Sequence, residues 1–182
     1  MAHEFSTSYV QDSLALFAYY KNLAEKAMAQ VTDADLTAVL DGEMNSIAVI
    51  VKHMEGNMRS RWTNFLTSDG EKPDRNRDAE FVEPPATREA LLSLWDRGWS
   101  YVFAALKPLS EQDLTLRIFI RGEPHSVMQA INRQMAHYAY HCGQIVLLAK
   151  HFGSARWQSL TVPRGHSADF NRRVAVGESS QR

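Results

Sequence analysis

The stretch Gln134-Met135-Ala136-His137-Tyr138-Ala139-Tyr140-His141-Cys142-Gly143-Gln144 lies inside a long segment whose apolar residues recur with helical spacing. Two residues four apart on a helix project from one face, about one turn from each other. His137 and His141 could therefore bring two imidazoles to one metal ion. A zinc-protease helix has a glutamate after its first histidine, and Tyr138 stands there instead, so the pair alone does not indicate that enzyme class.

Four long amphipathic segments, each with apolar residues three or four apart, predict an all-α fold. The helix that holds the histidine pair should begin at Ser126, a potential N-cap, and continue to about Phe152, before Gly153. The other three should span 6–31, then Asn45 or Ser46 to about Leu66, and Thr87 to Pro108. The connector 32–44 could contain a helical turn.

The segments between the predicted helices indicate how the helices are connected. Residues 67–86 are polar, charged and interrupted by prolines, and they are too long for a tight turn. A connection of this length can cross from one end of a bundle to the other and make the second and third helices parallel. Residues 114–120 alternate like a short strand, which would pair with the connector 32–44 or simply be extended. We expect one domain over 1–182, with a disordered tail at about 176–182.

Composition narrows the functional class. The 182 residues are 45 % hydrophobic and 23 % charged, as in a globular protein, and the formal net charge is -1. A net charge so close to zero does not favour nucleic acid or an anionic membrane as a partner. No apolar run reaches the roughly 18 residues of a membrane span, and the N-terminus does not resemble a signal peptide. With a single cysteine, the chain is expected to be cytoplasmic.

His53, in the predicted helix 45–66, is the best candidate for a third ligand. It belongs to a stripe of small and polar residues, including Asn57, next to the apolar face of that helix. Such a stripe is typical of a helix that lines a cleft. Buried imidazoles need partners for their ring nitrogens, and one shared divalent ion would satisfy three of them.

The histidine pair lies in a comparable stripe on its own helix. Gln134 and Gln144 share the stripe, and Tyr138 belongs to the apolar arc beside it. We therefore expect Asn57, Gln134, Tyr138 and Gln144 to line a pocket around the metal. The amides could orient ligands but would not transfer protons efficiently.

Other polar residues have simpler interpretations. We expect surface positions or local hydrogen bonds for His3, His125, His151 and His166, and a small packing role for Cys142. Arg61, Arg75 and Arg77 could bind an anionic substrate at a cleft mouth, although surface salt bridges are the simpler interpretation.

A lone histidine in Val51-Lys52-His53-Met54, followed by the later His-x-x-x-His pair, resembles the DinB/YfiT-like superfamily of metalloenzymes. More specific are several segments that resemble an uncharacterised bacterial subfamily: Asn45-Ser46-Ile47-Ala48, His53-Met54-Glu55-Gly56-Asn57, Ser60-Arg61-Trp62, Asp69-Gly70-Glu71-Lys72-Pro73, Arg121-Gly122-Glu123-Pro124-His125 and Ile131-Asn132-Arg133-Gln134. The resemblance covers almost the whole chain. It implies a four-helix bundle with up-down-down-up connectivity, a homodimer, and a divalent metal held by His53, His137 and His141.

Three functions are compatible with such a site. Three neutral imidazoles leave a position open for water or substrate, as in catalytic sites, and they suit zinc or nickel. Because characterised superfamily members include enzymes that use low-molecular-weight thiols, the first expectation is thiol transfer to a small electrophile. The alternatives are metal-dependent hydrolysis of a small amide or ester, and a metal-binding stress protein without turnover. No general base is identified.

Overall fold

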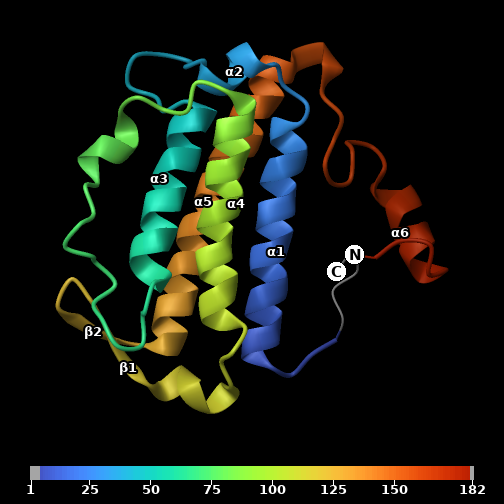
Figure 1. The fold of residues 1–182 in the computed structure, drawn as a ribbon. Helices are drawn as coiled ribbons and strands as arrows, with labels where there is room; N and C mark the ends of the chain where they lie inside the picture. Colours follow the sequence, from blue (N-terminus) through green and yellow to red (C-terminus); the bar gives the residue numbers. More distant parts are fainter. Residues whose placement is uncertain (1–4, 181–182) are drawn as a thin grey trace.

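The computed structural model describes residues 5–180 and shows a bundle of four long helices. The bundle consists of α1 (Tyr9–Met28), α3 (Ile47–Trp62), α4 (Arg88–Leu106) and α5 (Val127–Gly153). In Figure 1, α1 and α5 run in one direction and α3 and α4 in the other, so the connectivity is up-down-down-up. The predicted all-α bundle is confirmed.

Side-chain caps explain where the long helices begin. Ser8, Ser46, Thr87 and Ser126 each accept a hydrogen bond from the backbone N–H three residues later. Three of these caps were expected from the sequence. The ends are less regular: α3 stops at Trp62 rather than near Leu66, because Thr63 is extended and Asn64 adopts a left-handed conformation.

The centre of the bundle is aromatic, and each long helix contributes one large ring. Phe17 lies 6.4 Å from Trp62, 6.1 Å from Trp99 and 5.8 Å from Tyr138, measured between ring centroids. All four side chains are buried. Edge-on packing of this kind adds to the hydrophobic stabilisation and holds α3 and α5 in fixed relative positions.

The strand prediction needs correction. The strand β1 (Arg117–Ile120) pairs with β2 (Glu123–Ser126) in a hairpin, and not with the connector 32–44. Arg121 and Gly122 have positive φ, which suits a two-residue hairpin turn. The predicted strand also began too early, since Leu114 belongs to the 3-10 helix η2 (Glu111–Thr115).

The crossover 63–87 follows α3 and is fastened to the hairpin. Gly70 N–H donates to Phe119 O at 2.7 Å, and the Asp69 carboxylate accepts from the backbone N–H groups of Arg121 and Gly122. Within the crossover, the 3-10 helix η1 (Asp78–Phe81) packs against α3. A polar loop is thereby held in a fixed position over one bundle helix.

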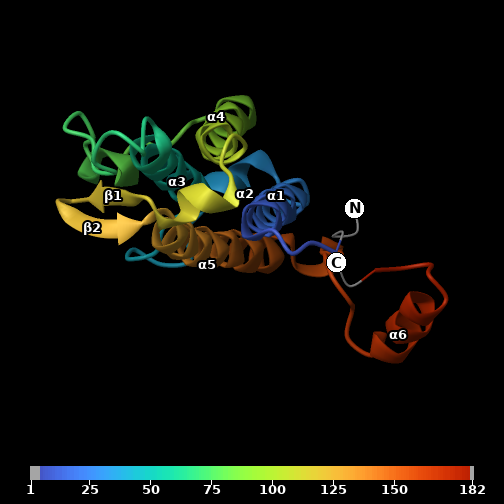
Figure 2. The ribbon, with the colours of Figure 1, turned by 90° about the horizontal axis from the view of Figure 1, so that it is seen from below.

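Shorter elements complete the chain. The connector contains one short helix, α2 (Asp33–Thr37), as expected. After η3 (Ser154–Arg156) comes α6 (Ser167–Ala175), which the sequence did not predict and which stands away from the bundle (Figure 2). Of the tail expected to be disordered, residues 181 and 182 lie outside the described residues. Between residues 5 and 180, no helix has both the length and the apolar character needed to span a membrane.

Candidate metal centre

The bundle brings together the three histidines singled out in the sequence. His53 lies on α3, and His137 and His141 lie on α5. The potential ligand atoms of the three side chains all lie within 4.8 Å of one another. The Nε2 atom of His137 lies 3.0 Å from His141 Nε2 and 3.4 Å from His53 Nε2. His53 and His141 are buried and His137 is half-buried.

The hydrogen bonds of two rings fix the positions of their protons. His53 Nδ1 lies 2.8 Å from a carboxylate oxygen of Glu80, and His141 Nδ1 lies 2.8 Å from Gln144 Oε1. Because both oxygens are acceptors, each Nδ1 carries the proton and each Nε2 has a free lone pair. Both lone pairs face His137 Nε2, whose single proton could satisfy only one of them.

This arrangement fits a bound cation. Metal–nitrogen bonds of about 2.0–2.1 Å separate neighbouring ligand nitrogens by roughly 3 Å, close to the two Nε2 separations here. Burial, together with the neighbouring histidines, lowers the pKa of His137 to about 3. Burial likewise lowers the pKa of His141 to about 4. Both rings are therefore neutral at physiological pH, the form that ligates metals.

Glu80 is a residue of the candidate site that sequence reasoning missed. It comes from η1 in the crossover, is buried, and accepts from Arg75 Nε at 2.8 Å and Arg75 Nη2 at 3.0 Å in addition to its contact with His53. Burial raises the pKa of this carboxyl, but hydrogen bonds from His53 and Arg75 outweigh that effect and lower it overall. A carboxylate behind a histidine is a common way to orient a ligating ring.

Gly56 provides the space that Glu80 occupies. A Cβ atom at this position of α3 would lie 2.4 Å from Glu80 Oε1 and 2.7 Å from Glu80 Cδ. Only glycine therefore lets the carboxylate approach the helix behind His53. An interior helical glycine one turn after a histidine was the one sequence signal that something packs there.

The four residues expected to line a pocket are placed in two different ways. Asn57, Gln134 and Tyr138 form a closed buried network: Gln134 Nε2 donates to Asn57 Oδ1 at 2.7 Å and to the Tyr138 hydroxyl at 2.9 Å. The same hydroxyl accepts from Trp62 Nε1 at 3.0 Å, and burial raises its pKa. This network joins α3 to α5 beside the histidines, whereas Gln144 contacts His141 directly.

Two aromatic rings flank the histidines. Phe81, next to Glu80 in η1, stacks on His53 with a centroid distance of 4.8 Å. Tyr140 lies 4.2 Å from His141 and 6.2 Å from His137, and its side chain is largely exposed. The centre therefore adjoins solvent on the α5 side and is covered by the crossover on the α3 side.

The other histidines and the cysteine lie elsewhere. His125 is in β2, with Nδ1 3.0 Å from Glu123 O, while His151 is exposed near the end of α5 and His166 precedes α6. His3 lies outside the described residues. Cys142 is buried, and burial raises the pKa of its thiol to about 12, consistent with a packing role.

The arginines proposed for anion binding are already engaged. The side chains of Arg61 and Arg75 are buried, and both form ion pairs with Glu71, at 2.9 and 3.2 Å. Arg77 lies over the Phe81 ring at 4.9 Å. Surface salt bridges were expected for these arginines, whereas the ion pairs of Arg61 and Arg75 are formed by buried side chains. Neither of these two charges is free to bind a substrate.

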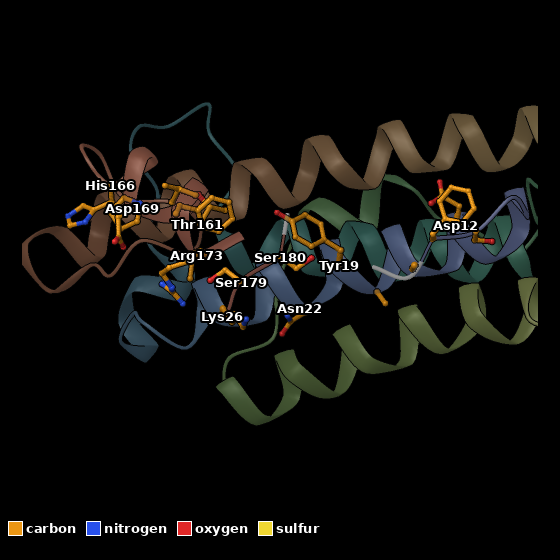
Figure 3. Close-up of a pocket in the computed structure, with 18 of the residues that line it drawn as sticks. Asp12, Tyr19, Asn22, Lys26, Thr161, His166, Asp169, Arg173, Ser179 and Ser180 are labelled. Carbon is orange, nitrogen blue, oxygen red and sulfur yellow. The ribbon is translucent and has the colours of Figure 1, made fainter. Parts of the chain in front are cut away.

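A large cavity lies away from the histidines. It measures about 1140 Å³ and lies between α1 and the C-terminal segment that includes α6 (Figure 3). Tyr19 and Lys26 line it from α1, and His166 and Arg173 from the C-terminal segment. It shares no residue with the histidine cluster.

Comparison with known proteins identifies a family but does not indicate an activity. The fold resembles a crystal structure of a conserved protein of a locus from Enterococcus faecalis, with a TM-score of 0.61, 14 % identity, and coverage of 81 % of this chain and 98 % of that one. At this identity the likeness concerns the fold alone. A search of curated protein sequences gives no significant match. Residues 4–166 match the model of a family described as "Protein of unknown function (DUF1572)", so the chain belongs to the DUF1572 family.

Proposed function

We propose that this protein binds one divalent transition-metal ion through the Nε2 atoms of His53, His137 and His141, and that it is a member of the DinB-like group. The observation that carries the proposal is the convergence of two Nε2 lone pairs on the third ring, with their Nδ1 protons held by Glu80 and Gln144. Without a cation, at least one of these buried lone pairs would lack a partner, which is unfavourable. Zinc and nickel both suit three imidazoles.

We further propose that the bound ion serves thiol transfer from a low-molecular-weight thiol to a small electrophile. When bound, such an ion acts as a Lewis acid and lowers the pKa of a coordinated group. In the transfer, the thiol would lose its proton to solvent water, its sulfur would bond to the electrophilic carbon, and the leaving group would depart with the electron pair. The half-buried face of His137, beside exposed Tyr140, gives small molecules a route to the site.

The choice of thiol over water rests on the lack of a free carboxylate base in the histidine cluster among residues 5–180. Both Glu80 oxygens are engaged by His53 and Arg75, and the potential ligand cluster in residues 5–180 contains histidines but no carboxylate. Activating water, with a pKa near ~15.7, requires more help than activating a thiol with a pKa near ~8.5. The site favours the substrate that deprotonates more easily.

A thiol panel tests the reaction. The metal-loaded protein, incubated with monochlorobimane and low-molecular-weight thiols, should form the thioether adduct, and His53→Ala should abolish this. The matched control is His151→Ala, an exposed histidine on α5 outside the cluster. Ester or amide hydrolysis by the loaded protein, without adduct formation, would instead support a hydrolase. Metal retention without any turnover would instead support a protein that binds metal and has no catalytic activity.

Gly56→Ala tests the role of Glu80 behind His53. The new methyl group would displace the Glu80 carboxylate, and loss of an orienting partner typically lowers metal affinity about 10–100-fold. Competition with a chromogenic chelator measures the change. Gly143→Ala is the matched control, because its Cβ would meet no atom within 4 Å and should leave affinity unchanged. Equal affinity for the two variants would show that Glu80 does not support the site.

A further inference from the structure

The C-terminal helix α6 lacks the buried face that normally stabilises a short helix. It contains nine residues, none of which is buried, and it stands away from the bundle (Figure 2). Isolated helices shorter than about 12–15 residues are marginal in water. The chain before α6 is nevertheless fastened to α1, because Gln30 and Gln158 exchange two hydrogen bonds, of 2.7 and 3.1 Å. A short helix is therefore tethered close to the bundle without packing tightly on it.

The space between α6 and α1 is the cavity of about 1140 Å³. Its volume is slightly above the roughly 300–1,000 Å³ of most small-molecule pockets. Along α1 it extends from Asp12 to Lys26, which corresponds to about 21 Å of helix at 1.5 Å per residue. The cavity is thus long enough for an extended ligand.

Between its polar ends the cavity is lined by apolar side chains from both sides. Those from α1 lie between Asp12 and Lys26 in the sequence, and Tyr19 among them is 47 % exposed. The apolar lining from the two sides comprises Ala15, Ala18, Tyr19, Leu160, Val162 and Phe170. An apolar ligand body placed between these side chains would remove them from water, which is favourable.

One end of the cavity carries positive charge without a counter-ion. Figure 3 shows Lys26 of α1 and Arg173 of α6 at this end, and neither forms an ion pair with any residue between 5 and 180. Asp169 lies at the same end, but it is already paired with Arg172. Asp12 lies toward the opposite end (Figure 3). The unpaired ammonium and guanidinium groups therefore favour an anionic group at one end of the ligand.

We propose that this cavity binds an aliphatic carboxylate, with its head group at Lys26 and Arg173 and its chain between α1 and Phe170 of α6. A carboxylate fits better than a phosphate monoester, because nearby Asp169 repels a dianion more strongly than a monoanion. The bound chain supplies the packing partner that α6 lacks. The cavity shares no residue with the histidine cluster, so the inference does not depend on metal binding.

Isothermal titration calorimetry of the full chain with decanoate tests the ligand class. One decanoate should bind per chain with micromolar affinity, and decanamide, its neutral analogue, should bind at least about tenfold more weakly because it lacks the charge. Equal affinity for the two compounds, or no binding of decanoate at millimolar concentration, would overturn the proposal. Tighter binding of decyl phosphate than of decanoate would overturn the choice of a carboxylate.

Two pairs of variants test the charged end. Lys26→Met and Arg173→Met should each weaken decanoate binding about tenfold or more, while decanamide binding stays nearly unchanged. Lys21→Met and Arg172→Met are the matched controls, because these residues lie on the same two helices but do not line the cavity. Circular dichroism checks that all four variants are folded. Wild-type affinity for decanoate in both cavity variants would contradict the assigned head-group position.

Hydrogen exchange tests the contact with α6. Decanoate should slow exchange of the backbone amides of residues 167–175 at least about tenfold, and it should leave α4, which does not line the cavity, unchanged. Phe170→Ser should lose this protection and weaken the binding of both compounds. Val174→Ser is the control, since Val174 is 37 % exposed on α6 outside the cavity. Amides of α6 that are already protected in the free protein, with no further effect of decanoate, would overturn the proposal.

Discussion

Replacing His53, His137 or His141 singly with alanine is expected to remove most of the bound metal, and replacing all three should remove the rest. The physical reason is that each ring supplies one Nε2 atom to the same point, and the described residues offer no fourth histidine, cysteine or acidic side chain in that cluster to take its place. Elemental analysis after loading with zinc or nickel measures the metal content per chain. Full occupancy in the triple variant would refute the site.

Thermal unfolding provides a second readout of the same variants. A ligand that binds only the folded state stabilises it by about 4 kcal/mol at a thousand times its dissociation constant. Metal should therefore raise the Tm of the wild type and of the His151→Ala control, and leave that of the triple variant unchanged. A metal-dependent increase in the triple variant would indicate binding elsewhere.

Arg75→Met is expected to destabilise the fold strongly. Both side chains of the Arg75–Glu80 pair are almost fully buried, at 2 % and 8 % exposure. Removing one partner of a buried pair leaves an uncompensated charge, which costs about 3–5 kcal/mol in the free energy of unfolding. Urea unfolding of the metal-free protein measures this loss without a contribution from metal binding.

Two comparisons make the Arg75 result interpretable. Arg59 pairs with Asp74 in the same part of the structure, but both side chains are much more exposed, so Arg59→Met should cost less than about 1 kcal/mol. The double variant Arg75→Met/Glu80→Leu should recover much of the stability, because it removes both buried charges. Equal losses for Arg75→Met and Arg59→Met would contradict the account of the crossover.

The sequence contained enough information for the bundle and for the candidate ligands. Helical periodicity and cap residues such as Ser46, Thr87 and Ser126 depend on local chemistry, so they are readable without the fold. The same holds for His137 and His141, which share a helix. His53 could be named because it lies in a polar stripe beside a core face.

The remaining features depend on tertiary contacts. Glu80 and Phe81 come from a crossover without periodicity, and only the fold brings them to His53. A polar stripe likewise does not distinguish a cleft from an internal hydrogen-bond network, which is why Asn57 and Gln134 were expected in a pocket. The partner of β1 was missed because Glu123 and Pro124, which belong to β2, show no alternation of apolar and polar residues that would indicate a strand.

The central claim is that three imidazoles from two helices hold one cation. Its most direct test is a crystal structure of the metal-loaded protein with anomalous diffraction data at the metal edge. The account predicts one strong anomalous peak within about 2.0–2.2 Å of Nε2 of His53, His137 and His141. Absence of that peak, or a peak coordinated by other residues such as His125 or His166, would contradict it.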